Sequence, residues 1–101
     1  MGQRLIVVIV NKSLAGRATE ITKIAGAKGG TVIKGFGSSS FEKKGFFGLD
    51  IEEEKCVILI VSPTENSQAI MDALNREIGF ENSNTGVAFV LNAETVIGVR
   101  T

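Results

Sequence analysis

The chain has 101 residues, enough for one domain with a modest hydrophobic core and too few for a second domain. It carries 11 basic and 11 acidic side chains, no tryptophan and no tyrosine. A neutral chain without these stacking residues argues against nucleic-acid binding, which needs a basic face. No apolar run approaches the ~18 residues of a membrane span, and the run 5–10 is too short for a signal peptide. We therefore expect a single cytoplasmic domain over residues 1–101, without membrane insertion.

The numbers of cysteines and histidines restrict which reactions and metal sites the chain can support. Cys56 is the single cysteine, and the chain has no histidine. A lone cysteine forms no intrachain disulfide and fits a reducing compartment. Because a nucleophilic thiol needs a nearby base, we interpret Cys56 as buried and inert. The sequence predicts neither a catalytic residue nor a metal site, since metal sites are built from paired cysteines and histidines.

The first half of the chain predicts a strand, a helix and a second strand. Residues 5–10 are six consecutive aliphatics, mostly β-branched, which indicates a central strand covered on both faces. Ser13 is a candidate N-cap, and residues 31–34 favour a second strand with a possible extension to Phe36. Between Ser13 and this strand, apolar residues recur at helical spacing, and glycines follow the last of them. The apolar stripe of this helix is Leu14, Ala18, Ile21 and Ala25, with Ile24 broadening it.

A long loop rich in glycine, serine and lysine follows, over about residues 37–50. Loops of this length within a compact domain are usually functional or disordered. This one carries three phenylalanines that a solvated loop does not need: Phe41, Phe46 and Phe47. We expect these rings to anchor the loop to its own assembly or, alternatively, to form an aromatic hot spot for a partner protein.

The second half predicts two strands, a helix and a short final strand. The acidic run 52–54 precedes the strand 56–61, and we interpret it as a solvated strand entrance because adjacent carboxylates on a strand point to opposite faces. Pro63 suits the turn before a helix, and Gly79 suits its end. The stripe of this helix is Ile70, Ala73, Leu74 and Ile78. Residues 86–91 and 96–100 complete the strands.

The order of these elements predicts an α+β fold. Two right-handed β-α-β halves joined by a long loop form a ferredoxin-like βαββαβ sandwich, with a long loop between strands 2 and 3 and a short C-terminal strand. Both helices lie on one face of the four-stranded antiparallel sheet in such a fold. Since the strands are apolar throughout, the helix-free face is expected to be covered by oligomerisation.

The chain has three segments, 25–32 with 34–37, 84–90 and 99–101, that resemble segments of the PII signal-transduction proteins. Residues 25–32 with 34–37 resemble the stretch that leads into the T-loop, 84–90 resemble the B-loop, and 99–101 resemble the basic C-terminal strand. The resemblance implies a homotrimer that binds ATP, ADP or AMP in inter-subunit clefts, as a ligand and not as a cofactor. It also implies no catalysis, and a T-loop that docks on a target transporter or metabolic enzyme in nitrogen or carbon metabolism.

The resemblance assigns adenine recognition to the start of the second strand and phosphate recognition to the T-loop base, the third strand, the B-loop and the C-terminus. The expected ligand-binding residues are Gly29, Thr31, Gly35, Gly37, Lys55, Gly86 and Arg100. Glycine lets the backbone approach a ligand, lysine supplies a point charge, and arginine clamps phosphate bidentately. The alternative is that these glycines serve only backbone turns and that the two basic residues are solvated surface charges.

The chain also departs from the family pattern. Val87 and Gly98 stand where the family has basic residues, and Thr85 stands where it has an acidic one. Ser38 and Ser39 replace an Arg-Gln pair, so the glutamine that helps to bind 2-oxoglutarate is absent. Uridylylation of a loop tyrosine is excluded because the chain has no tyrosine. The resemblance is therefore to a divergent member with a short T-loop.

Two alternative functions use the same fold. A metal-binding trimer would need ligand pairs that one cysteine and no histidine do not supply. A small acyl-phosphate hydrolase would need an anion-cradling loop with an arginine directly after the first strand, and a positioned asparagine. The chain has Asn11-Lys12-Ser13 at that point and no arginine in the turn.

Overall fold

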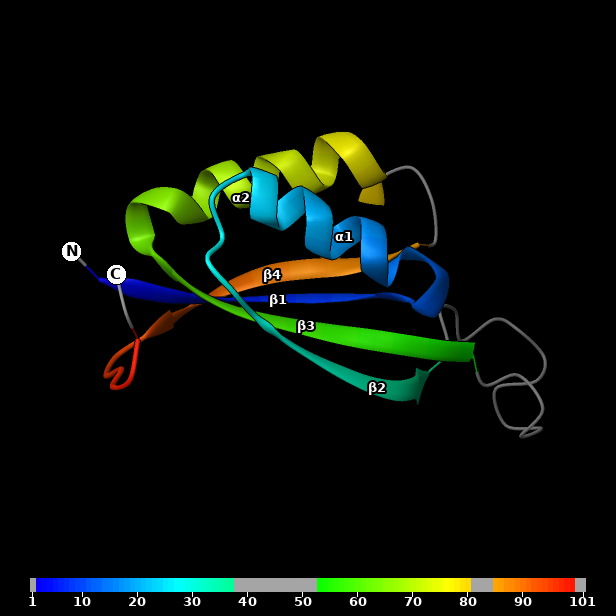
Figure 1. Cartoon of the computed structure of the whole chain (residues 1–101), viewed down its shortest axis with the longest axis horizontal. Coiled ribbons are helices and arrows are strands. Elements are labelled where there is room, and N and C mark those ends of the chain that lie inside the picture. The colour runs from blue at the N-terminus through cyan, green and yellow to red at the C-terminus, as the bar shows by residue number, and fades with distance from the viewer. Residues whose placement is uncertain (1, 38–52, 81–84, 100–101) are drawn as a thin grey trace.

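The computed structural model describes residues 2–37, 53–80 and 85–99. Its elements follow the order β1-α1-β2-β3-α2-β4 (Figure 1). The strands are β1 (Gln3–Asn11), β2 (Thr31–Gly37), β3 (Glu53–Pro63) and β4 (Gly86–Ala93), and the helices are α1 (Lys12–Ile24) and α2 (Thr64–Ile78). The predicted T-loop beyond Gly37, its three phenylalanines at 41, 46 and 47, and Arg100 lie outside the described residues.

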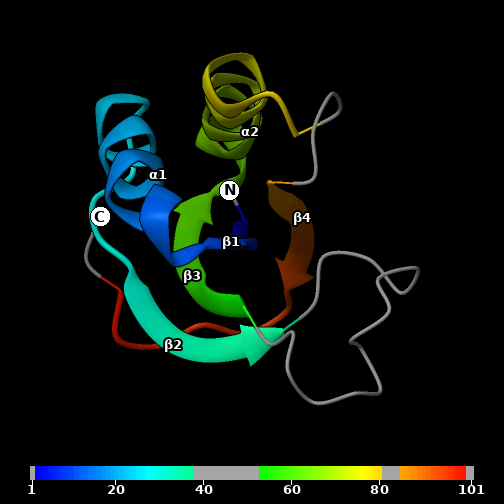
Figure 2. The same ribbon diagram turned by 90° about the vertical axis from the view of Figure 1, so that its right-hand side faces the viewer.

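The four strands form one sheet in the order β2-β3-β1-β4, and every neighbouring pair is antiparallel. Both helices lie on the same side of this sheet, as the end-on view in Figure 2 shows. This arrangement confirms the predicted ferredoxin-like sandwich. It also confirms that the aliphatic run 5–10 belongs to an inner strand, since β1 pairs with β3 on one side and with β4 on the other.

The hydrophobic core lies between the helices and one face of the sheet. Because strand side chains alternate, every second residue of β1 and β3 points to the helices. Burial of each large aliphatic side chain contributes about 1.5–3 kcal/mol relative to an exposed one. The largest buried side chains of this core are Ile6, Val8, Val10, Ile58, Ile60, Ile70 and Leu74.

The ends of the helices follow the predictions in part. Gly79 closes α2 in a left-handed conformation with φ 74°, and its amide donates to the Asn75 carbonyl. The predicted Ser13 cap is wrong, because Asn11 occupies the N-cap position and α1 already begins at Lys12. Ile24 is 78% exposed, so it does not belong to the buried stripe in which the helical spacing placed it.

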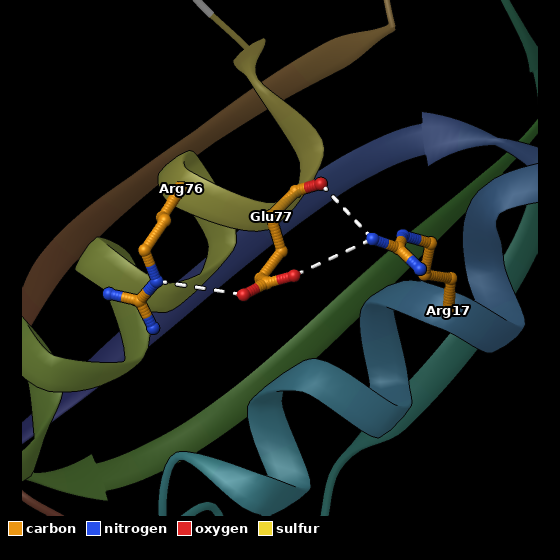
Figure 3. Close-up of polar contacts among 3 residues, drawn as sticks. All are labelled: Arg17, Arg76 and Glu77. Atoms are coloured by element: carbon orange, nitrogen blue, oxygen red, sulfur yellow. Dashed lines mark hydrogen bonds and ion pairs between the residues drawn. The ribbon is translucent and has the colours of Figure 1, made fainter.

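An ion-pair cluster joins the two helices on their outer side (Figure 3). The Arg17 Nη2 atom lies 3.3 Å from the Glu77 carbonyl oxygen, to which it donates, and 3.6 Å from Glu77 Oε1. The Arg76 Nε atom lies 3.6 Å from Glu77 Oε2. Since all three side chains are exposed, we expect these pairs to contribute less than about 1 kcal/mol each.

The predicted C-terminal strand is wrong over the residues that are described. β4 ends at Ala93, and residues 94–99 form no strand. Gly98 has φ 90°, which is incompatible with an extended strand and needs a residue without a Cβ. Within the described part of the chain, no helix is long and apolar enough to cross a lipid bilayer.

Candidate functional site

The helix-free face of the sheet is apolar over all four strands. In β1, Leu5, Val7 and Ile9 alternate with the core residues and therefore point away from the helices. Their register partners on the neighbouring strands are also apolar, and Leu91 at the β4 edge is 51% exposed. We call this surface the open face; its apolar members are Leu5, Val7, Ile9, Ile33, Val57, Leu59, Val61, Val87, Phe89 and Leu91. A contiguous apolar surface of this kind marks an interaction site.

Four of the seven predicted ligand-binding residues meet at one end of this sheet, on the right in Figure 1. Gly35 of β2 is the register partner of Lys55, and Gly37 is the partner of Glu53. Gly86 enters at the same end, opposite the end of β1, where it pairs with Val10. The predicted T-loop base, the entrance of β3 and the predicted B-loop glycine therefore lie at the same end of the sheet, with β2 and β4 as its two opposite edge strands.

Lys55 is buried although it carries a charge, with 8% of its surface exposed. Its Nζ atom donates a 2.6 Å hydrogen bond to Asn11 Oδ1 and lies 3.4 Å from Glu53 Oε1. The aliphatic part of the side chain passes beside Gly37, where a built Cβ would make an ordinary van der Waals contact of 3.5 Å with Lys55 Cγ. The alternative of a solvated surface lysine is therefore wrong for Lys55.

Packing within the chain requires glycine at one position of the candidate site and not at two others. A Cβ at Gly86 would overlap the carbonyl oxygen of Ile9, so the close approach of β4 to β1 explains this glycine without a ligand. A Cβ at Gly29 or Gly35 would meet nothing within 4 Å in the described part of the chain. Intrachain packing therefore does not require glycine at these two positions, which leaves the space beside them for a ligand or a second subunit.

Gly29 and Thr31 lie at the other end of β2, away from Lys55. They line a cavity of about 480 Å³ together with the segment that follows β4, including Gly98 and Val99. Thr31 is the register partner of Leu59, four residues along β3 from Lys55. At about 3.3 Å per strand residue, Thr31 and Gly37 are separated by about 20 Å. A single chain thus holds two half-sites: the Lys55 end and the Thr31 end.

The acidic residues at the start of β3 do not both remain solvated. Glu54 is exposed and lies 3.3 Å from Lys12 Nζ, as expected of a solvated strand entrance, whereas Glu53 pairs with the buried Lys55. Among residues 2–37, 53–80 and 85–99, no group of three His, Cys, Asp or Glu side chains is placed to hold a metal ion. Cys56 is 2% exposed, which confirms the predicted buried thiol.

Asn11 and Glu53 are the site residues that sequence reasoning missed. The signal for Glu53 was present, because residues two apart on a strand share a face, and Glu53 and Lys55 are two apart. Asn11 gave no such signal. Its partnership with Lys55 depends on the β1–β3 register, in which the two residues are directly opposite.

Solved structures share this fold. CPII, a nitrogen regulatory PII-like protein from Thiomonas intermedia K12 bound to ADP, AMP and bicarbonate, matches with TM-score 0.73 and 19% identity over 98% of both chains. Arabidopsis thaliana PII bound to citrate matches with TM-score 0.73 and 22% identity, over 99% of this chain and 85% of that one. A putative PII-like signalling protein from Thermus thermophilus matches with TM-score 0.66 and 23% identity, over 92% of this chain and 91% of that one.

Comparison with curated proteins finds no significant match. The family model described as nitrogen regulatory protein P-II, in contrast, matches residues 3–101. This match covers both half-sites and every element of the sheet. On this match the chain belongs to the nitrogen regulatory protein P-II family.

Proposed function

We propose that this P-II family protein is a homotrimeric regulator that binds a small anionic ligand, an adenine nucleotide (ATP, ADP or AMP), in clefts between subunits. In this proposal the T-loop acts on a target transporter or metabolic enzyme of nitrogen or carbon metabolism. The protein works in the cytoplasm, where a free thiol such as Cys56 persists. The observation that carries the proposal is an apolar open face with a buried lysine at one end and a glycine-lined cavity at the other.

The open face supports assembly through the sheet. Its apolar side chains continue across all four strands, and leaving Phe89 and Leu91 in water loses the hydrophobic stabilisation that their burial would give. A chain of 101 residues has no further helix to cover this face within the described ranges. Further copies of the same chain would cover it and would also bring the half-sites of neighbouring subunits together.

The separation of the half-sites supports a cleft between subunits. Within one chain, Thr31 of β2 and Lys55 of β3 are four residues apart along the ladder, about 13 Å on strand geometry. We propose that the cleft brings Thr31 of one copy together with Lys55 of another, so that one nucleotide touches both. In this arrangement the adenine lies at Gly29 and Thr31, and the phosphates lie at Gly35, Gly37, Lys55 and Gly86.

The chemistry of Lys55 supports an anion as the ligand. A buried ammonium is costly unless it is paired, and a charge-assisted hydrogen bond to a phosphate would satisfy it strongly. Among the structural relatives, CPII is bound to ADP, AMP and bicarbonate, and the Arabidopsis protein is bound to citrate. These are all small anions, which supports the same ligand class here.

Two measurements test the proposal together. Native mass spectrometry of the purified chain should give a trimer, and its thermal stability should rise with ATP, ADP or AMP. At a ligand concentration of 100 times Kd, the stabilisation per site is about 2.7 kcal/mol. A stable monomer, or a trimer whose melting temperature does not respond to any adenine nucleotide, would contradict it.

The surroundings of Asn11 favour a regulator over an acyl-phosphate hydrolase. The turn after β1 is Asn11-Lys12-Ser13, and the Asn11 side chain accepts its hydrogen bond from Lys55. An asparagine held in this way is poorly placed to position a water for attack on an acyl phosphate. We therefore propose that the protein is not an enzyme, and an assay with an acyl phosphate should show no turnover.

A further inference from the structure

The carboxylate of Glu53 lies where an anion bound at Lys55 would lie. Residues 53 and 55 are on the same face of β3, and Glu53 Oε1 is 3.4 Å from the Lys55 Nζ atom. Lys55 has three N–H donors, of which the Asn11 amide oxygen accepts one at 2.6 Å. In the described part of the chain, the ammonium is therefore neutralised internally by one carboxylate and oriented by one amide.

The local geometry explains why this arrangement forms. Gly35 and Gly37 are the β2 residues opposite Lys55 and Glu53, and neither presents a side chain to them. The stem of Lys55 passes beside Gly37, and the residue is only 8% exposed, which leaves its ammonium with little water. An unpaired buried ammonium is strongly unfavourable, so a carboxylate two residues away on the same face is held close to it.

Glu53 is the more solvent-accessible member of this ion pair. Its side chain is 34% exposed, whereas that of Lys55 is 9% exposed, so water reaches the carboxylate more readily than the ammonium. Asn11 occupies the N-cap position of α1, but its side chain makes no hydrogen bond to the helix. The side-chain oxygen instead accepts the hydrogen bond from Lys55. An incoming anion therefore finds Lys55 already positioned, with a carboxylate as its competitor.

We infer that Glu53 is an intramolecular competitor for the anion subsite at Lys55, and that it sets the affinity and the charge preference of the nucleotide site. This inference rests on the proposed function. A ligand gains the charge of Lys55 only after Glu53 has moved away. Its apparent affinity is therefore the intrinsic affinity multiplied by the fraction of molecules in which Glu53 is displaced. A phosphate dianion displaces the carboxylate more readily than a monoanion does, which makes the site selective for phosphorylated ligands.

The test compares Glu53→Gln with Glu54→Gln in the full-length assembly, by calorimetry with ADP and with adenosine. Both variants remove one negative charge from adjacent positions, but Glu54 pairs with the exposed Lys12 instead of Lys55. We expect Glu53→Gln to bind ADP about three- to tenfold more tightly than the parent, whereas Glu54→Gln should change ADP affinity less than about twofold. Adenosine has no phosphate, and its affinity should not change in either variant.

Three results would overturn the inference: unchanged ADP affinity in Glu53→Gln, weaker ADP binding in it, or an equal gain in Glu54→Gln. A parallel thermal-shift series with inorganic pyrophosphate separates this inference from the proposed function. If no variant binds ADP but Glu53→Gln is stabilised by pyrophosphate more than the parent, the nucleotide proposal fails and the competition stands. If Glu53→Gln is folded and binds neither probe more tightly than the parent, the competition is refuted.

Discussion

The two faces of this sheet have the same apolar character and different surroundings. On the covered face, Ile6, Val8 and Ile58 are shut off from solvent by two helices of the same chain. On the open face, Phe89 and Leu91 remain partly in water because the chain provides no layer there among its described residues. An apolar pattern thus specifies that a strand is to be buried on both faces, but does not specify which polypeptide buries it. Substitutions on the two faces should therefore separate intrachain burial from interchain burial.

The largest effect is expected on the covered face. Ile58→Ala removes a 2%-exposed side chain that packs in the core, so it should lower the free energy of unfolding by about 2–5 kcal/mol. The measurement is urea denaturation followed by circular dichroism. A loss well below about 1 kcal/mol would mean that the helices do not seal this face as tightly as the burial indicates.

The next effect is expected on the open face, where a charge should disrupt assembly and leave the subunit folded. Leu91→Glu places a carboxylate on a half-exposed position, so the isolated chain tolerates it, whereas a buried interface does not. Analytical ultracentrifugation should show the parent as a trimer and the variant as smaller species. Ile24→Glu is the matched control, because Ile24 is exposed on the helix side and its replacement should leave the assembly intact. A trimeric Leu91→Glu variant would place the interface elsewhere.

A third effect is expected where the open face meets the T-loop base. Lys55→Met keeps the buried aliphatic stem and removes the ammonium, so ADP binding should weaken about 10- to 100-fold, as for a lost hydrogen bond to a charged group. Calorimetry with ADP measures this change. Arg17→Met removes an exposed positive charge from the helix side and should leave the ADP affinity unchanged. Equal losses in the two variants would indicate a general charge effect and not a phosphate contact.

The smallest effect is expected on the outer surface of the helices. Arg17→Ala breaks the exposed pair with Glu77 and should change the free energy of unfolding by less than about 1 kcal/mol. Urea denaturation at low and at high salt checks this, and the difference from the parent should shrink as salt screens the pair. A larger, salt-independent loss would show that the hydrogen bond from Arg17 to the Glu77 carbonyl in Figure 3 joins the helices more strongly than its exposure indicates.

Local patterns in the sequence predicted most of the fold. Consecutive aliphatics in β1, helical spacing in α1 and α2, and a glycine after α2 are each properties of a few neighbouring residues, so they can be read without the rest of the chain. The errors occurred where a neighbour in space decides the outcome. Residues 96–99 have strand-like composition, but with Gly98 at φ 90° they form no strand. Ser13 is a good cap by type, but β1 ends at Asn11 and places that residue at the cap position.

Periodicity and composition were sufficient to predict a βαββαβ domain with more apolar strand residues than its own helices can cover. The burial of Lys55 against Asn11 and Glu53, and the position of Gly29 and Thr31 at the far end of the sheet from it, depend on how the strands pair. These two kinds of property act over different ranges. Periodicity reports which face of an element is apolar, whereas pairing register sets which residues from distant segments become neighbours.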